Sequence, residues 1–258
     1  MKLVAAIASL CLIASSSSYA EQNTMQTSNY LRSTDLQMVA PALEKYAQGP
    51  VAELWKRPGL SPRDRSIVTL AAMIARNQTA DLRECLYRAL DNGVKPREIS
   101  EIVTHLAFYA GWPNAMAAVP AAKYVFTELK IGPDQLPAVS PSPLKLDEEA
   151  EKQREQRIGA QFGKVAPGVT QYTTDALFRD LWLRPDLTPR DRSLVTVSAL
   201  IASGQVAQLP SHLTRAMNNG LTPEEAGEVL TQLAFYAGWP SVFTALPVVK
   251  QVIDTRLE

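Results

Sequence analysis

Apolar residues recur at intervals of three and four in two segments of the chain, and this spacing predicts helices that turn one face toward a core. The recurring positions are Ile67, Leu70 and Ile74 in the first segment and Leu194, Val197 and Ile201 in the second. No segment carries a convincing strand pattern. The hydrophobic pattern therefore predicts an all-α protein.

Both apolar segments follow a polar motif that is typical of a helix start. Residues 61–64 read Ser-Pro-Arg-Asp and residues 188–191 read Thr-Pro-Arg-Asp, which supplies a capping hydroxyl, a proline at the first helical position and an acid at the third. Asn92-Gly93 and Asn219-Gly220 suit the left-handed conformation that ends a helix, and residues 222–225 form a new capping box. The turns are short, so consecutive helices are expected to lie antiparallel.

The same order of signals occurs twice because the chain contains an internal duplication. Leu-Trp at 54–55 recurs at 181–182, an offset of 127 residues, and the longest identity, LAFYAGWP at 106–113, recurs at the same offset. Val39 pairs with Val165 at an offset of 126. A gap-free match of this length indicates two tandem copies of one small helical-bundle domain.

The boundaries of the two copies follow from composition. Residues 132–146 are rich in proline, which neither continues a helix nor donates a backbone hydrogen bond, and this stretch is predicted to be the linker. The charged segment 147–157 is expected to start the second copy as a solvated helix. We therefore predict a first domain at 21–131 and a second at 147–258.

Residues 1–20 have the pattern of a secretory signal peptide. Lys2 precedes an apolar stretch, and the segment ends in Ser-Tyr-Ala, which predicts cleavage after Ala20. The alternative, a membrane anchor, is disfavoured because the apolar run is shorter than the ~20 residues that cross a bilayer. The mature protein is expected to be periplasmic or secreted, without membrane contact.

Charge and cysteine content narrow the chemistry. The chain has 26 basic and 26 acidic residues, and this balance argues against a nucleic-acid partner, which would need a basic face. Removal of the signal peptide leaves Cys85 as the single cysteine, so no intramolecular disulfide can form. The sequence has no metal-ligand cluster, glycine-rich phosphate loop or serine-histidine-acid arrangement, and neither a metal nor a cofactor is predicted.

The order of motifs resembles the carboxymuconolactone decarboxylase family, which has an alkylhydroperoxidase D-like fold. The resemblance rests on the Pro-Arg-Asp-Arg helix start, a helix of the form L-x-x-H-x-x-x-A-x-x-N-G at 209–220, and a closing Tyr-Ala-Gly-x-Pro, and it covers most of the mature chain twice. It implies a lyase or isomerase that acts on a small carboxylated or lactone metabolite. It also implies a homo-oligomer with pockets at subunit contacts, in which the fused pair would mimic one dimer.

A related redox branch carries a Cys-x-x-Cys pair before the helix histidine. Here those positions hold Gln78 and Asp81 in the first copy and Gln205 and Gln208 in the second. Dithiol peroxidase chemistry needs one thiolate to attack and another to resolve the product. A chain with one mature cysteine cannot perform it alone.

The two histidines occupy positions at which the copies differ. His212 stands at the position of the family's helix histidine, and its counterpart 127 residues earlier is Cys85. His105 has Gln232 as its counterpart. If the copies pack about a pseudo-twofold axis, Cys85 and His212 would be expected to face each other across it.

His212 is the leading candidate for a general acid or base, because imidazole can move a proton to or from an enolate-like carbon as carbon dioxide leaves. The alternative is a buried histidine that bridges helices by hydrogen bonds. For His105 the structural alternative is favoured. Cys85 lies between Asp81 and Arg88 on its predicted helix, so a nucleophilic or redox role is open, although a small buried hydrophobic residue is the favoured interpretation.

Arg65 and Arg192, each next to an aspartate, are candidates to anchor a substrate carboxylate. The alternative is an ion pair with Asp64 or Asp191 near the helix start.

Two tryptophans, Trp112 and Trp239, and two tyrosines, Tyr109 and Tyr236, either line a pocket or close the helix corner. Core packing is favoured because both copies keep them.

Two other classes of function remain open at this point. One is a noncatalytic protein that binds a small molecule between its halves. The other is a thiol-dependent peroxidase or redox protein that uses Cys85 with an external thiol.

Overall fold

The structure is a computed structural model that describes residues 33–257, so the predicted signal peptide lies outside the described residues. Within this range the chain is helical and has no strand, which confirms the all-α prediction. The chain divides into two compact units after Glu44. The described part of the first unit is helix α2 (Ser33–Val39) and the start of α3 (Pro41–Tyr46).

The second unit contains the four-helix core of each copy. In the first copy a π-helical turn, η2 (Ala47–Val51), and the short α4 (Ala52–Leu54) precede this core. The core helices are α5 (Pro62–Ala75), α6 (Leu82–Asp91), α7 (Pro96–Tyr109) and α8 (Trp112–Glu128).

The second copy repeats this order after an extra helix, α9 (Glu148–Phe162). Helix α10 (Pro167–Tyr172) runs into the turns η4 (Thr173–Phe178) and η5 (Leu181–Leu183). The remaining elements are α11 (Pro189–Ala202), η6 (Val206–Gln208), α12 (Leu209–Asn218), α13 (Pro223–Tyr236) and α14 (Trp239–Leu257). The duplicated, all-helical architecture is thus confirmed.

The predicted helix starts form as expected. The Ser61 hydroxyl accepts a hydrogen bond from the Asp64 backbone N–H at 3.0 Å, and the Thr188 hydroxyl accepts the equivalent bond at 3.1 Å. Gly93 and Gly220 have φ angles of 89° and 103°, in the left-handed region that a side chain would disfavour, and they end α6 and α12.

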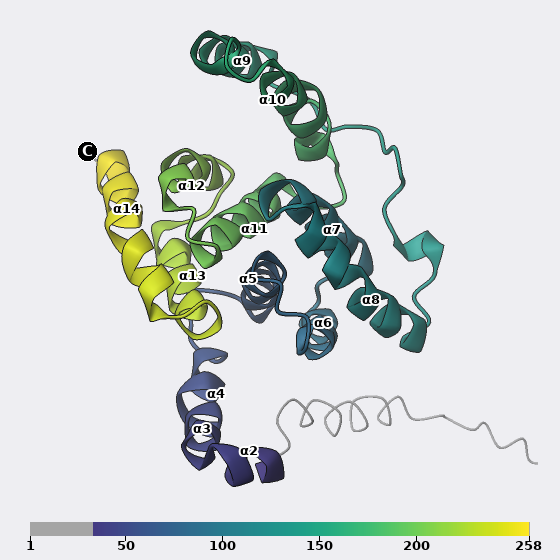
Figure 1. Cartoon of the computed structure of the whole chain (residues 1–258), viewed down its shortest axis with the longest axis vertical. Coiled ribbons are helices and arrows are strands. Elements are labelled where there is room, and N and C mark those ends of the chain that lie inside the picture. Colours follow the sequence, from purple (N-terminus) through teal and green to yellow (C-terminus); the bar gives the residue numbers. More distant parts are fainter. Residues whose placement is uncertain (1–32, 258) are drawn as a thin grey trace, which may run out of the picture. The chain divides into compact units, whose positions relative to one another are not determined.

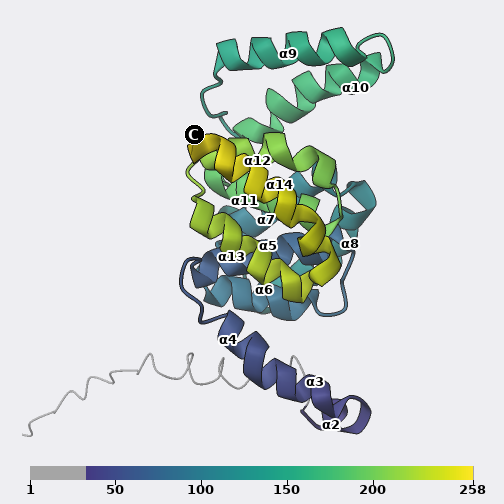
Figure 2. The ribbon, with the colours of Figure 1, turned by 90° about the vertical axis from the view of Figure 1, so that its left-hand side faces the viewer.

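Helices α5 and α11 form the centre of the unit (Figure 1). The predicted apolar faces are buried, but burial extends around both helices, because they pack against each other and each also packs against a helix of the other copy. Helix α13 packs on α5, and α7 packs on α11. In Figure 2, α13 and α14 lie over this central pair. The two copies therefore share one core.

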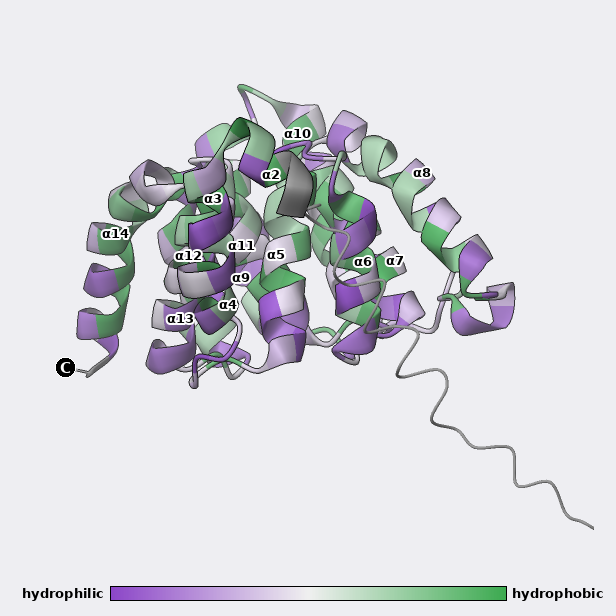
Figure 3. Cartoon of the chain, turned by 90° about the horizontal axis from the view of Figure 1, so that it is seen from below, coloured by the Kyte–Doolittle hydropathy of each residue, from purple (hydrophilic) through white to green (hydrophobic). Residues whose placement is uncertain are grey.

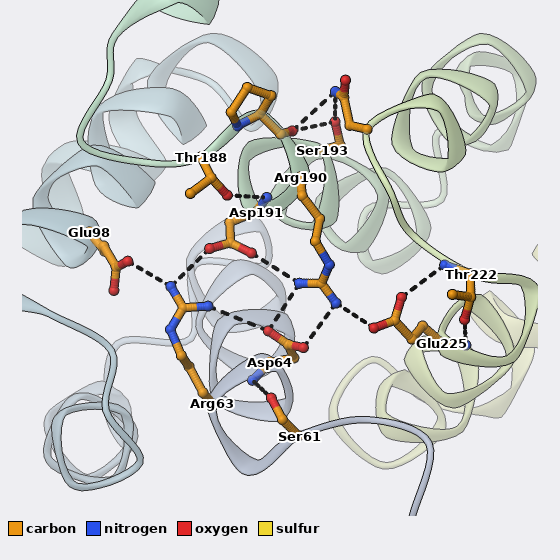
Figure 4. Close-up of polar contacts among 12 residues, drawn as sticks. Ser61, Arg63, Asp64, Glu98, Thr188, Arg190, Asp191, Ser193, Thr222 and Glu225 are labelled. Atoms are coloured by element: carbon orange, nitrogen blue, oxygen red, sulfur yellow. Dashed lines mark hydrogen bonds and ion pairs between the residues drawn. The ribbon is translucent and has the colours of Figure 1, made fainter.

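A pseudo-symmetric set of ion pairs joins the starts of α5 and α11 (Figure 4). Arg63 pairs with Asp191 at 2.8 Å, and Arg190 pairs with Asp64 at 3.0 Å. Each arginine also binds a glutamate, Glu98 for Arg63 and Glu225 for Arg190, both at 2.6 Å. These helix-start aspartates thus pair with Arg63 and Arg190, both across the copies and within them, rather than with Arg65 and Arg192.

The linker and α9 make more contacts with the rest of the second copy than their composition predicted. The Leu144 backbone N–H donates to the Leu183 carbonyl at 2.7 Å, and the Arg184 guanidinium donates to the carbonyls of Ala138 and Val139. Helix α9 forms at the expected place, but it is solvated only in part. Two of its charged residues, Glu151 and Arg154, are buried.

The outer helices α8 and α14 carry alternating hydrophobic and hydrophilic stretches (Figure 3). Trp112 and Trp239 at their starts are 62% and 51% exposed, so the prediction that these tryptophans pack in the core is wrong. Each belongs to a set of four exposed apolar residues at equivalent positions of the repeat. The sets are Phe108, Trp112, Met116 and Val119 in the first copy and Phe235, Trp239, Phe243 and Leu246 in the second.

Candidate active site

Two pseudo-equivalent sites lie between the copies, and each takes elements from both. The His212 site combines α7 of the first copy with η5, α11 and α12 of the second. The Cys85 site combines α13 of the second copy with the Trp55 region, α5 and α6 of the first. The contacts that define them share no residue.

A tyrosine-tryptophan hydrogen bond closes each site. Trp182 Nε1 donates to the Tyr109 hydroxyl at 2.9 Å, and Trp55 Nε1 donates to the Tyr236 hydroxyl at 3.0 Å. Burial raises the pKa of Tyr109 to about 12, so this hydroxyl stays protonated at neutral pH. The two tyrosines thus line sites between the copies, where the sequence favoured core packing.

The arginine candidates are fully buried and already bound. Arg192 Nη2 lies 3.0 Å from Glu101 Oε2, and both side chains are inaccessible to solvent. Arg184 binds the same carboxylate at 2.8 Å. In the Cys85 site, Arg65 and Arg57 share Glu228 in the same manner, at 2.7 and 2.5 Å. A substrate role for Arg65 or Arg192 stays a prediction, and the geometry favours a structural one.

His105 is buried with both ring nitrogens engaged. Its Nε2 lies 2.7 Å from the Thr196 hydroxyl, and its Nδ1 lies 3.4 Å from Arg192 Nη1. The single hydroxyl proton of Thr196 is donated to the Arg192 carbonyl at 2.9 Å, so Thr196 accepts from His105 Nε2–H. Nδ1 then accepts from Arg192. Burial first, and the Arg192 charge second, hold the pKa of His105 well below its usual range, which keeps this tautomer neutral.

Gln232 reproduces these bonds in the Cys85 site. Its Nε2 donates to the Thr69 hydroxyl at 3.1 Å, and its Oε1 accepts from Arg65 Nη1 at 3.1 Å. An amide and a neutral Nε2–H imidazole therefore present the same donor and acceptor to equivalent partners. This equivalence indicates that His105 and Gln232 have a structural role and join the two copies by hydrogen bonds.

His212 is different because its ring has unused hydrogen-bonding capacity. Nδ1 is buried and finds no hydrogen-bond partner among the described residues. The ring packs edge-on against Tyr109, with centroids 5.2 Å apart, and stacks on Trp182 at 6.5 Å. Burial, assisted by the Arg215 charge, lowers the pKa of His212 to about 4. The imidazole is therefore neutral at pH 7.

Cys85 carries a buried thiol in the other site. It lies near Tyr236, whose pKa is raised by burial, and the Arg88 guanidinium covers the Trp55 ring of the same site at 4.6 Å. The expectation that Cys85 and His212 face each other is wrong, because each copy contributes its helix to a different site. His105 and His212, from opposite copies, lie in the same site, where Tyr109 contacts both rings.

Several residues of the His212 site were not singled out from the sequence. The repeat shows that Trp55 and Trp182 occupy equivalent positions, as do Glu101 and Glu228. A residue that both copies keep can belong either to a functional site or to the core, so repetition alone does not identify a site. Apart from their charge, no sequence feature marked Arg215 and Arg154 as candidate site residues. Among residues 33–257, no group of three or more histidine, cysteine or acidic side chains could hold a metal ion, and no helix is long and apolar enough to span a bilayer.

Comparison with known proteins agrees with this architecture. Residues 40–124 and 167–251 each match the carboxymuconolactone decarboxylase family, and the chain belongs to this family. It is 37% identical over 94 residues to a 4-carboxymuconolactone decarboxylase of Acinetobacter baylyi, which covers 36% of this chain and 68% of the relative. It is 34% identical over 79 residues to the nitrosuccinic acid decarboxylase npaB of Metarhizium robertsii, which covers 31% of this chain and 55% of the relative.

Both relatives carry the name decarboxylase. At the level of its family, the chain is therefore a decarboxylase-like enzyme of the lyase class.

Proposed function

We propose that the His212 site is the active site of a lyase or isomerase that acts on a small carboxylated or lactone metabolite. The observation that carries this proposal is the His212 imidazole, which is neutral at pH 7 and whose Nδ1 atom has no hydrogen-bond partner among the described residues. A proton-transfer group needs a ring nitrogen that the protein does not already occupy.

In a decarboxylation, His212 acts as the general acid that delivers one proton. When the bond between the α-carbon and the carboxylate breaks, carbon dioxide leaves and the electron pair stays on the carbon. A substrate carboxylate beside His212 favours the charged imidazolium, which raises its pKa and lets the site take up a proton on binding. His212 then donates that proton to the carbon, and water restores it to the ring. In a lactone isomerisation the same ring would remove and return a proton.

The remaining residues position the ring and exclude water. Tyr109 and Trp182 hold His212 between apolar surfaces. His105, Arg192 and Glu101 brace the α7–α11 contact beneath them. We assign Arg192 to this bracing role, since its guanidinium is fully buried against Glu101.

The proposal is tested by a turnover screen of the purified mature protein. Small lactones and 3-oxo or unsaturated carboxylic acids are supplied, and carbon dioxide release and ring opening are both recorded. His212→Ala should abolish turnover while the protein stays folded. Turnover that survives in this variant would overturn the role of His212. A folded wild-type protein that turns over no compound but binds one would favour the noncatalytic alternative.

The thiol-dependent alternative is tested separately. Cys85→Ser would abolish peroxide consumption if Cys85 were the reactive group. We expect neither peroxide consumption in the wild type nor a change in lyase turnover in Cys85→Ser, because Cys85 lies in the other site.

We also propose that the protein is exported, with cleavage after Ala20, and that it forms a homo-oligomer. Peptide sequencing of the purified mature protein would test the cleavage site. The two equivalent sets of exposed apolar residues around Trp112 and Trp239 support self-association, since exposed apolar patches of this kind mark interfaces. Light scattering should show a multiple of the chain mass that falls in Trp112→Glu and Trp239→Glu, and a monomeric wild type would refute it.

A further inference from the structure

Helix α9 lies outside the two segments that match the family, yet it carries a buried arginine. Arg154 binds Glu151 through two hydrogen bonds of 2.8 and 2.6 Å and donates to the Thr174 hydroxyl at 3.0 Å. Its side chain is only 8% exposed. The third nitrogen, Nη1, is buried and finds no partner among the described residues.

The Arg154 guanidinium lies close to the His212 site. It covers the Phe178 ring at 4.4 Å, and the Arg215 guanidinium lies 4.9 Å from the same ring. Phe178 stacks on Trp182 at 6.1 Å, and Trp182 in turn stacks on His212. A helix from outside the family-matched segments therefore brings a cation to within two aromatic rings of the candidate proton-transfer group.

Arg215 has no hydrogen-bonded counterion in the described part of the chain. It covers the rings of Phe178 and Trp182, but it makes no hydrogen bond or ion pair with any described residue. Burial is the largest influence on its pKa and lowers it, while the nearby Tyr109 and Glu151 oppose that shift and the Arg154 charge adds to it. Two partly desolvated guanidiniums, one with an N–H nitrogen that has no partner and one without a hydrogen-bonded counterion, form a place where an anion would gain charge-assisted hydrogen bonds.

We propose that Arg154 and Arg215 together hold an anionic group of the substrate, and that α9 is thereby a specificity-determining element of the His212 site. This inference rests on the proposed function, because the anion is held beside His212. In the Cys85 site, Arg88 stands at the position of Arg215. Arg154 belongs to α9, outside the two segments that match the family, so the family-matched repeat gives it no counterpart in that site.

Succinate binding, followed by NMR of the histidine rings, tests the inference without any turnover assay. The chain has two histidines, and the His105→Gln variant leaves one signal and so assigns His212. Bound succinate should raise the pKa of His212, because a nearby anion favours the imidazolium. Arg154→Gln and Arg215→Gln should weaken succinate binding at least tenfold. Arg88→Gln, the matched change in the Cys85 site, should leave this binding unchanged.

A second variant separates anion binding from a purely structural role of Arg154. Glu151→Gln removes the negative charge that competes with an anion for Arg154, so it should tighten succinate binding. If Arg154 served only to attach α9, loss of its ion pair would leave binding unchanged or weaken it, and that result would overturn the inference. Equal losses in Arg154→Gln and Arg88→Gln would overturn it as well.

The outcome is distinguishable from that of the proposed function. Succinate binding that depends on Arg154, with turnover that survives in His212→Ala, would keep the anion subsite and remove the catalytic role of His212. Turnover that depends on His212, together with succinate binding that does not change in Arg154→Gln, would keep the catalytic role of His212 and remove the anion subsite.

Discussion

Trp182 Nε1 donates a 2.9 Å hydrogen bond to the Tyr109 hydroxyl, and this bond joins the second copy of the repeat to the first. Trp55 and Tyr236 make the reciprocal bond at 3.0 Å. The only donor of each indole is thus satisfied by the opposite copy. Because the exchange is reciprocal, each variant at one site has a matched control at the other.

Tyr109→Phe and Tyr236→Phe should each lower the free energy of unfolding by about 1 kcal/mol, because each leaves a partly buried indole N–H without its acceptor. Urea denaturation measures this loss. Turnover should fall only in Tyr109→Phe, since only that ring touches His212. Equal effects of the two variants on turnover would contradict the assignment of the active site.

Stability should fall as the pH drops from about 6.5 toward 4. His212 has a pKa of about 4 in the folded protein against a usual 6.5, so the unfolded chain binds more protons in this window. The stabilisation is fully present above pH 6.5 and is lost on acidification. His212→Asn should reduce the slope by about 1 kcal/mol per pH unit. Denaturation at several pH values measures it, and an unchanged slope would show that His212 is not shifted.

His105→Gln should fold with nearly wild-type stability, because Gln232 already makes the equivalent bonds in the other site. His105→Leu should lose roughly 2 kcal/mol, since it removes the acceptor of Arg192 Nη1 and the donor to the Thr196 hydroxyl in a buried place. Thermal and urea unfolding compare the two variants. A Gln variant as unstable as the Leu variant would refute the tautomer assigned to His105.

The helix-start ion pairs should contribute to the contact between the copies. Asp191→Asn removes the charge that Arg63 and Arg190 share and should lower the unfolding free energy by roughly 2 kcal/mol. Asp64→Asn is the matched change at the other helix start and should cost a similar amount. Chemical denaturation measures both. A loss confined to one aspartate would contradict the pseudo-symmetry of the network.

The helices, their starts and the duplication could be predicted from the sequence, because these features depend on local chemistry. A hydroxyl three residues before an acid favours a helix start through hydrogen bonds within one turn, and Gly93 and Gly220 end helices because their backbone adopts φ above zero. The 127-residue offset likewise identifies Cys85 and His212 as equivalent positions of the repeat. None of these inferences requires knowledge of what lies across the fold.

The composition of the sites depended on packing between segments far apart in the chain. Helix α7 packs on α11 of the other copy, so His105 and His212 lie on either side of Tyr109 in one site, while Cys85 lies near Tyr236 in a separate site. The burial of Arg192 and the orphan nitrogen of Arg154 are likewise results of that packing. A repeat establishes which positions correspond, but only the docking of the two copies decides which of them touch, because one amphipathic pattern is compatible with many arrangements of the same helices.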